Sequence, residues 1–273
     1  MAFPTTQLEN LEITRLICGT NGFLGYSHFS AARDRWIREY FTVERIAEVI
    51  ARFAELGVNA VMGPLNDKLI AALEQVERHT GVSMIYIATP GGHTVEEVIE
   101  GVRQSAEAGA KVCMPHQMYT DTHLIPAETR IEGIEPILAE IRRLGMIPGL
   151  STHRPETIIV CDKAGYDVAT YIQPYNASGF LCQVETDWIG KVIRGTPKPV
   201  MCIKPLGAGR ILPPTGLNFV YSTCKPTDMV VIGTMNVYEA EEDVRLALEI
   251  LTGEPAGVEL TFSRSKLVLT GDR

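Results

Sequence analysis

Short apolar runs alternate with longer segments of helical periodicity along most of this chain. Between Thr42 and Gly57, apolar side chains recur every three or four residues, which predicts an amphipathic helix that begins after Thr42 and ends at Gly57. Thr94 and Glu97 have the spacing of a capping box and predict the start of another helix. The predicted strands cover residues 15–20, 59–62, 84–88, 111–114, 147–150, 168–172, 199–203 and 229–232.

This alternation of strands with helices predicts an α/β protein with a parallel sheet. A single (β/α)8 TIM barrel spanning residues 1–273 accounts for all the units, since such barrels take about 250 residues. The alternative is a doubly wound sheet, which carries a glycine-rich turn of the form G-x-G-x-x-G after its first strand. The turn here, Gly-Thr-Asn-Gly at 19–22, lacks that spacing. We therefore expect the barrel.

Two segments are longer than a minimal barrel requires. Residues 22–41 form a long connection after the first strand and carry six aromatic side chains. Long ordered connections often act as lids or binding loops, and the alternative is an aromatic cluster that only anchors the connection. Residues 254–273 form a C-terminal extension of strand-like character, which would cover the barrel or pair with a second subunit in a homo-oligomer.

Composition narrows the class of protein. The net charge of −8 disfavours nucleic acid and anionic membranes as partners, and no apolar run approaches the roughly 18 residues of a membrane span. The N-terminus has neither a basic nor an apolar signal region, and the six cysteines form no C-x-x-C pair. We therefore expect a cytoplasmic protein with reduced thiols whose partner is a small-molecule substrate.

Reacting groups in a (β/α)8 barrel come from the C-terminal ends of the strands and the loops that follow. Three histidines, His93, His116 and His153, follow consecutive predicted strands, and Lys204 follows the seventh. We expect His116, His153 and Lys204 to be the catalytic residues. Further candidates for substrate or cofactor binding at the strand ends are Asn21, Tyr119, Ser151, Gln173, Tyr175, Asn176, Arg210, Gly233 and Thr234.

Several of these segments together resemble the aldo-keto reductases. The resemblance lies in ITRLICGTNGFLG at the first strand, ELGVNAV at the second, KVCMPHQMYTD at the fourth and GLSTHRPETI at the fifth. It continues in YIQPYN, KPLGAG and DMVVIGT at the last three strands, so it spans nearly the whole chain. The resemblance implies an aldo-keto-reductase-like barrel and NADPH as a cofactor.

The resemblance also implies roles for individual residues. His116 falls on the family's catalytic histidine, which orients the substrate carbonyl. Ser151 and Gln173 fall where the family binds the nicotinamide carboxamide, and Lys204 falls near an aromatic that stacks on the nicotinamide ring. Gly233 and Thr234 lie near the end that holds the cofactor phosphate.

The sequence departs from the family at two catalytic positions. Met62 takes the place of the family's Asp, and the loop GPLND at 63–67 is too short to contain the tyrosine that protonates the carbonyl. Thr89 and Pro90 stand where the family has a lysine. Hydride transfer to a carbonyl leaves an alkoxide, and a positioned acid contributes roughly 10² to 10⁴ in rate. We therefore expect a divergent active site that does not catalyse the standard reduction.

Several chemistries remain open at this stage. We favour acid–base chemistry of the isomerase or lyase type, centred on His116, on a sugar-like or keto substrate. A divalent metal held by His93, His116 and His153 is a second hypothesis, and a Schiff base at Lys204 a third. The fourth hypothesis is an NADPH-dependent reductase whose proton donor is His116, Tyr119 or Tyr175. The fifth is a non-catalytic binding protein. The cofactor therefore stays unknown.

Overall fold

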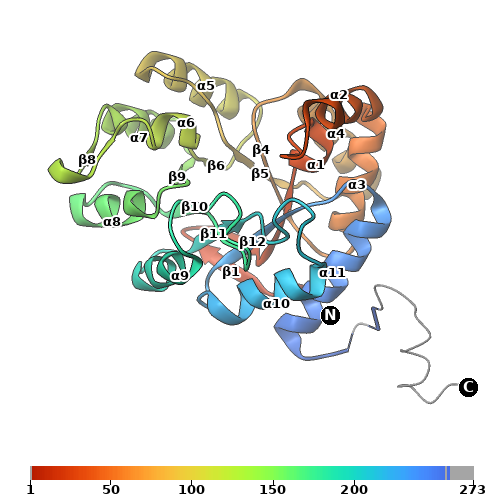
Figure 1. Ribbon diagram of the computed structural model, residues 1–273. Helices are drawn as coiled ribbons and strands as arrows, with labels where there is room; N and C mark the ends of the chain where they lie inside the picture. Colours follow the sequence, from red (N-terminus) through yellow and green to blue (C-terminus); the bar gives the residue numbers. More distant parts are fainter. Residues whose placement is uncertain (1, 256, 259–273) are drawn as a thin grey trace, which may run out of the picture.

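A computed structural model describes residues 2–255 and 257–258. Eight parallel strands form a closed barrel, in which each strand pairs with the next barrel strand along the chain and β12 closes on β3. Figure 1 shows the helices arranged around the outside of this barrel. The predicted (β/α)8 barrel is therefore confirmed. Its strands are β3 (Leu16–Gly19), β4 (Ala60–Gly63), β5 (Ile85–Ala88), β6 (Val112–Cys113), β9 (Ile147–Ser151), β10 (Thr170–Pro174), β11 (Val200–Ile203) and β12 (Met229–Gly233).

Each barrel strand packs on both of its faces. Side chains such as Ile17, Met62 and Met201 fill the barrel interior, and their neighbours, such as Leu16 and Cys18, pack outward against the helices. This two-sided burial explains why the strands are almost entirely apolar. The helices that follow the barrel strands are α3 (Val43–Glu55), α4 (Asp67–Thr80), α5 (Val95–Glu107), α7 (Ile134–Arg143), α8 (Pro155–Ala164), α9 (Thr186–Gly195), α10 (Pro213–Thr223) and α11 (Val237–Thr252).

The predicted helix starts are found where the capping residues indicated them. The Thr42 hydroxyl accepts a hydrogen bond from the backbone N–H of Arg45 at the start of α3. At the start of α5, Thr94 accepts from the Glu97 N–H, and the Glu97 carboxylate accepts from the Thr94 N–H, which completes the capping box. Pro155 occupies the first turn of α8, where its missing N–H leaves no hydrogen bond unmade.

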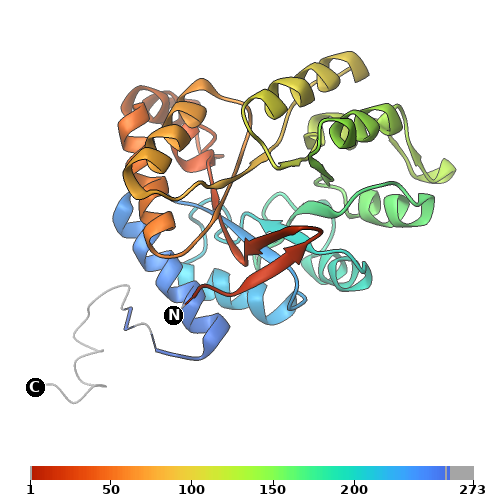
Figure 2. The ribbon, with the colours of Figure 1, turned by 180° about the vertical axis from the view of Figure 1, so that it is seen from behind.

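An N-terminal hairpin covers the barrel end opposite the strand C-termini, and the hydrophobic pattern did not predict it. Its antiparallel strands are β1 (Thr5–Leu8) and β2 (Leu11–Thr14), and Figure 2 shows them lying across the barrel. Leu8 and Ile13 are buried and pack with the barrel interior. The hairpin therefore closes the bottom of the core.

The long connection at 22–41 is not a loop but contains two helices. They are α1 (Asn21–Leu24) and α2 (Ala31–Tyr40), the second capped by the Ser30 hydroxyl. Phe23 packs against Phe41 with ring centroids 6.1 Å apart, and both rings are buried in the core that surrounds the barrel, which anchors the segment. The remaining short elements are α6 (Gln117–Thr120), β7 (Leu124–Ile125), the 3-10 helix η1 (Pro126–Glu128) and β8 (Arg130–Ile131).

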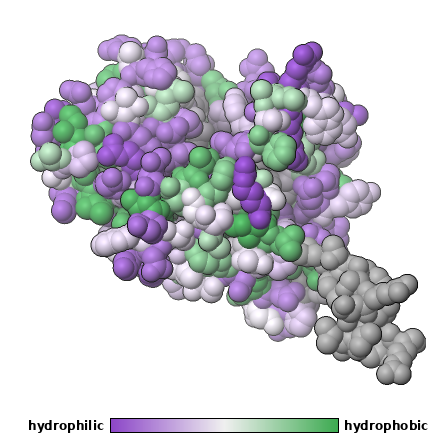
Figure 3. Space-filling model, viewed as in Figure 1, coloured by the Kyte–Doolittle hydropathy of each residue, from purple (hydrophilic) through white to green (hydrophobic). Residues whose placement is uncertain are grey.

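Polar and apolar residues are interspersed on the face of the molecule that Figure 3 displays. Among the described residues, no helix is both long and apolar enough to cross a membrane. Most of the predicted C-terminal extension, residue 256 and residues 259–273, lies outside the described residues.

The N-terminal hairpin gives a direct test of the core. We expect Leu8→Ala to lower the free energy of unfolding by about 3 kcal/mol, because Leu8 is 2% exposed and its removal leaves a cavity under the barrel. Urea denaturation followed by circular dichroism measures the change. The exposed neighbour Gln7 is the control, and Gln7→Ala should change the same free energy by less than about 0.5 kcal/mol. Equal effects of the two substitutions would show that the hairpin is not part of the core.

Candidate active site

A cavity of about 650 Å³ opens at the C-terminal ends of the barrel strands. Its walls come from the loops after β3, β4, β5, β6, β9, β11 and β12, together with the 22–41 segment. This is the location that the barrel fold predicts for a functional site. The predicted site residues that line the cavity are Asn21, His116, Ser151, His153, Lys204, Arg210 and Gly233.

His116 lies at the start of the short helix α6. Its Nδ1 accepts a hydrogen bond from the backbone N–H of Met118 at 3.3 Å. A neutral imidazole with an accepting Nδ1 carries its proton on Nε2. Burial, and then the nearby Lys204 charge, lowers the pKa of His116 below its usual value, which keeps the ring neutral at physiological pH. His116 therefore offers the cavity one Nε2–H donor.

His153 and Lys204 face each other at the ends of β9 and β11. The Lys204 Nζ lies 3.5 Å from the His153 Nε2. Burial lowers the pKa of Lys204 to about 8, and burial together with the Lys204 charge lowers the pKa of His153 to about 3. At neutral pH Lys204 is therefore mostly protonated, and His153 is a neutral imidazole.

No carboxylate among the described residues forms an ion pair with Lys204. Its backbone has a φ of +61°, a conformation that is uncommon for any residue other than glycine. The Gly207 N–H donates to the Lys204 carbonyl at 3.0 Å and closes the turn that holds this conformation. The amine is thus held in the cavity wall without the partner that a buried lysine usually has.

Asp121 positions the loop that carries His153. Its Oδ2 accepts from the His153 backbone N–H at 2.9 Å, and its Oδ1 accepts from the Thr152 hydroxyl. The Arg154 guanidinium donates to the Asp121 carbonyl at 3.3 Å. Burial raises the pKa of Asp121, although these hydrogen bonds oppose the shift. The carboxyl therefore acts on the loop backbone and not on the reacting groups.

The 22–41 segment forms one wall of the cavity. Tyr26, His28, Phe29 and Arg33 all line it, and none of the four was a predicted site residue. Burial, and then the Lys204 charge, lowers the pKa of His28, so the segment lies within electrostatic reach of the His153–Lys204 pair. The sequence signals for this wall were the aromatic content and length of the connection and the position of His28 in the loop after the first strand.

Arg210 lies beside this wall. Its guanidinium stacks over the Phe180 ring at 4.2 Å from the centroid and donates to the Gly207 carbonyl at 2.9 Å. It forms no ion pair with any described residue. Together with Lys204 it makes this half of the cavity electropositive.

Two buried polar residues also line the cavity: Thr20, which follows β3, and Asp243 of α11. Thr20 and Asp243 are 2% and 3% exposed, and Thr20 Oγ1 and Asp243 Oδ1 have no hydrogen-bond partner. Burial, followed by the charges of Glu239 and Glu242, raises the pKa of Asp243 to about 8. The sequence pattern of this helix indicated only that its acidic residues complement the helix dipole.

Three predicted binding residues are structural instead. Tyr119 is fully buried and its hydroxyl donates to the Glu132 carbonyl at 2.8 Å, so it does not line the cavity. The Tyr175 hydroxyl donates to the Thr223 hydroxyl at 2.9 Å. The Asn176 side chain closes the turn that follows β10, where it bonds both the N–H and the carbonyl of Phe180.

Two further predicted residues lie behind the cavity wall. Ile172 lines the cavity, and because successive strand residues face opposite sides, Gln173 faces outward with Tyr171. Thr234 is 1% exposed and is also absent from the cavity lining. Gln173 and Thr234 therefore do not line this cavity, and their binding roles stay predictions.

The predicted metal site is not formed. His93 is exposed and does not line the cavity, and its backbone N–H donates to the Glu97 carboxylate at the start of α5. The described part of the chain contains no group of three or more His, Cys, Asp or Glu side chains placed to hold a metal ion. His93, His116 and His153 cannot bind one metal ion together, because His93 lies on the outer surface.

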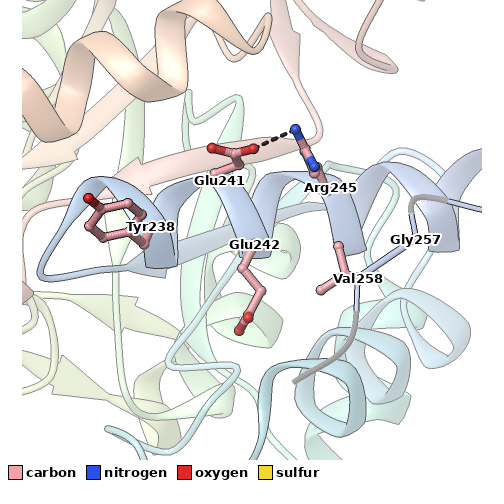
Figure 4. Close-up of a pocket in the computed structure, with 6 residues that line it drawn as sticks. All are labelled: Tyr238, Glu241, Glu242, Arg245, Gly257 and Val258. Carbon is pink, nitrogen blue, oxygen red and sulfur yellow. Dashed lines mark ion pairs between the residues drawn. The ribbon is translucent and has the colours of Figure 1, made fainter. Parts of the chain in front are cut away.

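A second cavity, of about 300 Å³, lies on the outside of α11 (Figure 4). It is lined by Tyr238, Glu241, Glu242 and Arg245 of the helix and by two residues that follow it. Glu241 pairs with Arg245 and also with Arg52 of α3. This cavity is lined by no histidine or lysine, so the strand-end cavity remains the candidate active site.

Comparison with known proteins shows the fold. No model of a known protein family matches the sequence, and no curated protein matches it. Solved structures do match. A candidate aldo-keto reductase from Pseudomonas aeruginosa superimposes with a TM-score of 0.66 at 16% identity, over 91% of this chain and 94% of the other.

Two further aldo-keto reductase structures agree with this match. The glycerol dehydrogenase from Gluconobacter oxydans gives a TM-score of 0.61 at 11% identity, over 96% of this chain and 100% of the other. An aldo-keto reductase from a Medee basin deep-sea metagenome gives 0.56 at 10% identity, over 96% and 99%. The chain therefore has an aldo-keto-reductase-like barrel. At this sequence identity the matches establish the fold, and the chemistry must be argued from the residues of the site.

The buried carboxyl of Asp243 gives a prediction for stability against pH. Its pKa is raised in the folded state, so its stabilising contribution is present below the unfolded value near 4 and is lost as pH rises toward 8. We expect Asp243→Asn, which does not ionise, to melt several degrees above the wild type at pH 8 and close to it at pH 5. Thermal unfolding by circular dichroism at both pH values measures this. The exposed Asp187 of α9 provides the matched control, and an Asp187→Asn difference of the same size would refute the assignment to Asp243.

Proposed function

We propose that this protein is a small-molecule enzyme that transfers a proton on a polar, sugar-like or keto substrate, in a reaction of the isomerase or lyase type. The observation that carries the proposal is the 3.5 Å approach of the Lys204 Nζ to the His153 Nε2 inside the strand-end cavity. His116 lines the same cavity and supplies the third group. The cavity thus combines a base (Lys204), a residue that orients it (His153) and a hydrogen-bond donor (His116).

Lys204 is the proposed base. A general base works best when its pKa is near the operating pH, and burial brings the pKa of Lys204 to about 8. The amine form removes a proton from the carbon beside the substrate carbonyl, and the resulting ammonium remains next to the negative charge that develops. His153 stays neutral and accepts a hydrogen bond from Lys204, which orients the amine.

His116 is the proposed partner of the carbonyl oxygen. The Met118 N–H occupies its Nδ1, so its Nε2–H is the donor available to the cavity. Proton removal beside a carbonyl moves negative charge onto the carbonyl oxygen. A hydrogen bond to that oxygen therefore stabilises the enolate more than the ketone. A neutral imidazole with this tautomer provides such a donor.

An NADPH-dependent reductase is the alternative that the fold suggests, and the residues present do not fit the cofactor. Met62 and Thr89 line the cavity at the positions where the resemblance places the family's acid and lysine. Neither side chain can protonate an alkoxide. The proton that a hydride transfer requires would therefore have to come from His116 or from the Lys204 ammonium, which line the same cavity.

The end of the cavity that would take the cofactor phosphate is also occupied by groups of this chain. The Asn236 side chain accepts hydrogen bonds from the Tyr238 and Glu239 N–H groups at the start of α11. Glu242 and Asp243 line the cavity at the same end. A helix N-terminus that is already capped and flanked by carboxyl groups is a poor phosphate site.

A non-catalytic binding protein is the second alternative. A pocket that only binds an anion needs a lysine that stays fully charged, whereas burial beside His153 lowers the pKa of Lys204 to about 8. The unpaired Lys204 amine and its histidine partner therefore favour catalysis over binding alone.

Solvent deuterium exchange tests the proposed proton transfer on any compound that carries a proton beside a carbonyl. We expect the purified protein in D₂O to exchange this proton in at least one member of a panel of ketoses and keto acids, as followed by ¹H NMR. Lys204→Met should slow this exchange by about 100-fold or more, and His116→Ala by a similar factor. Lys191→Met, on the exposed face of α9, should exchange at the wild-type rate.

The exchange rate should also depend on pH. Lys204 acts as the amine, so the rate rises with pH and levels off above about 8. This rise should disappear in Lys204→Met. Exchange at the wild-type rate in Lys204→Met would remove Lys204 from the mechanism, and absence of exchange across the whole panel would reject proton transfer.

A fluorescence titration with NADPH separates the proposal from the reductase alternative. We expect no saturable binding up to about 1 mM, the upper end of the range in which enzymes usually bind their substrates. The physical reason is that the first N–H groups of α11 already donate to Asn236 and that carboxyl groups line the cavity beside them, so the cofactor phosphate has no favourable site. Saturable binding at micromolar NADPH would overturn this reasoning and make reduction the leading function.

A further inference from the structure

The Lys204 amine has a neutral imidazole beside it where a buried lysine usually has a carboxylate. Its Nζ lies 3.5 Å from the His153 Nε2 in the strand-end cavity, and no Asp or Glu in the described part of the chain forms an ion pair with it. Burial lowers the pKa of Lys204 to about 8, whereas an ordinary lysine titrates at about 10.4. A fraction of the amine therefore has a free electron pair at neutral pH, and such an amine is a nucleophile.

The backbone holds this amine in a conformation that is typical of functional sites. Lys204 has a φ of +61°, and the Gly207 N–H donates to its carbonyl at 3.0 Å in the turn between β11 and α10. Non-glycine residues in such a conformation are uncommon, and they cluster at active sites and ligand clamps. The amine is therefore attached to a hydrogen-bonded turn and lies beside His153 in the lining of the cavity.

Two histidines match the proton transfers that accompany addition of an amine to a carbonyl. The nitrogen must lose a proton after the C–N bond forms, and the oxygen must gain protons before it leaves as water. The His153 Nε2, at 3.5 Å from Nζ, is placed to take the proton from nitrogen. After burial, the Lys204 charge lowers the pKa of His153, and this charge disappears when the nitrogen gives up its proton. His116 lines the same cavity with its Nε2–H available to the oxygen.

The charges near the amine favour a ligand with an anionic group. Burial is the first cause that lowers the pKa of His28, and the charges of Lys204 and Arg210 add to it, although Asp34 opposes them. Both cations therefore act on one part of the cavity wall. The Arg210 Nη2 donates to the His28 carbonyl at 3.4 Å, and Arg210 forms no ion pair with any residue that the structure describes. A ligand anion would give it the partner that the protein does not.

The carboxyl groups that line the cavity do not offset these cations at Lys204. Glu239, Glu242 and Asp243 all belong to α11, whereas Lys204 follows β11. None of the three carboxyl groups perturbs the pKa of Lys204, which burial lowers and the nearby Cys182 raises. The amine therefore lies in a part of the cavity where positive charge prevails.

We propose that Lys204 is also a covalent site, at which its amine adds to the carbonyl of a small aldehyde that carries an anionic group and forms an imine. The inference goes beyond the proposed proton transfer, although it uses the same amine. The nitrogen electron pair forms the C–N bond, and the carbonyl π electrons move to the oxygen, which takes up a proton.

The carbinolamine then collapses to the imine. His153 takes one proton from the nitrogen and returns it to the hydroxyl, which leaves as water while the nitrogen electron pair forms the C=N bond. The ammonium form of Lys204 and one aldehyde thus give one protonated imine and one water. The step needs no oxidant, reductant or metal ion.

Reductive trapping with glyoxylate tests the covalent site. Glyoxylate is an anionic aldehyde with no hydrogen on the carbon beside its carbonyl, so it reports on imine formation and not on proton transfer. Sodium cyanoborohydride reduces the imine to a stable secondary amine, and peptide mass spectrometry locates the carboxymethyl-lysine. At neutral pH we expect Lys204 to be labelled at least about tenfold faster than the exposed Lys191 of α9, with a rate that saturates in glyoxylate.

The ratio of the labelling rates of Lys204 and Lys191 cancels the intrinsic reactivity of the aldehyde. Methyl glyoxylate has the same aldehyde without the charge, and its ratio should be lower by about threefold or more. Arg210→Met should lower the ratio for glyoxylate and leave that for the ester unchanged. His153→Gln should lower both ratios by about tenfold or more, because an amide does not take up a proton. Melting temperatures establish that the variants are folded, and the wild-type ratios need no variant.

The outcomes separate the covalent site from the proposed proton transfer. Labelling of Lys204 no faster than that of Lys191, or labelling without saturation, overturns the imine even where deuterium exchange depends on Lys204. Selective, saturable labelling of Lys204 supports the imine, and it does so even where no member of the ketose and keto acid panel exchanges its proton. Equal ratios for glyoxylate and its methyl ester overturn the anionic class of ligand.

Discussion

The pairing of β12 with β3 is the constraint on which the rest of the molecule depends. Parallel hydrogen bonding from Val230 opposite Leu16 to Gly233 opposite Gly19 joins the last barrel strand to the first. A Cβ on Gly22 would lie 2.5 Å from the Thr234 carbonyl oxygen, so only glycine permits this approach of the two strand ends. Closure brings the 22–41 segment and α11 to the same rim of the barrel. Without it, the cavity would lack the lining that the 22–41 segment and α11 provide.

Closure also explains why polar chemistry concentrates where it does. The barrel interior is filled with apolar side chains from the hairpin upward, and all eight strands deliver their next residues to one rim. Charged groups on that rim are only partly solvated, because the barrel lies below them and the 22–41 segment lies beside them. Burial is accordingly the first cause of the pKa shifts of His116, His153, Lys204 and Asp243. One physical effect therefore produces a weakly basic amine at one end and a protonated acid at the other.

Sequence patterns predicted the barrel because its strands and helices are locally consistent. The apolar strands, the Thr42 cap and the Thr94 capping box each act within a few residues, and all were found. The N-terminal hairpin escaped prediction because its strands are four residues long and are stabilised by contacts with the distant barrel interior. The α2 helix was missed because its aromatic residues suggested a binding loop.

The site was predictable only in part, because the sequence gives the position of a residue after a strand but not the direction of its side chain. Position after a strand correctly placed His116, His153 and Lys204 at the cavity. It did not determine which way a side chain faces, so Gln173 and Tyr119 were included although they face the surrounding core. The missing hydrogen bonds of Thr20 and Asp243 could not be predicted, because an unsatisfied hydrogen bond is a property of the folded surroundings and not of a local pattern.

The cost of holding Lys204 in place is itself an argument about function. The residue combines a left-handed backbone with an amine buried without an ion-pair partner among the described residues, and each feature destabilises the folded protein. A glycine would relieve the first and an apolar side chain the second. A lysine with a purely structural role at this position would destabilise the fold in both ways and gain nothing in return. The same two features become useful when part of the amine must be unprotonated near physiological pH and fixed beside a substrate, because the turn restricts its direction and burial lowers its pKa to about 8. The strain and the chemistry therefore have one origin in the turn between β11 and α10.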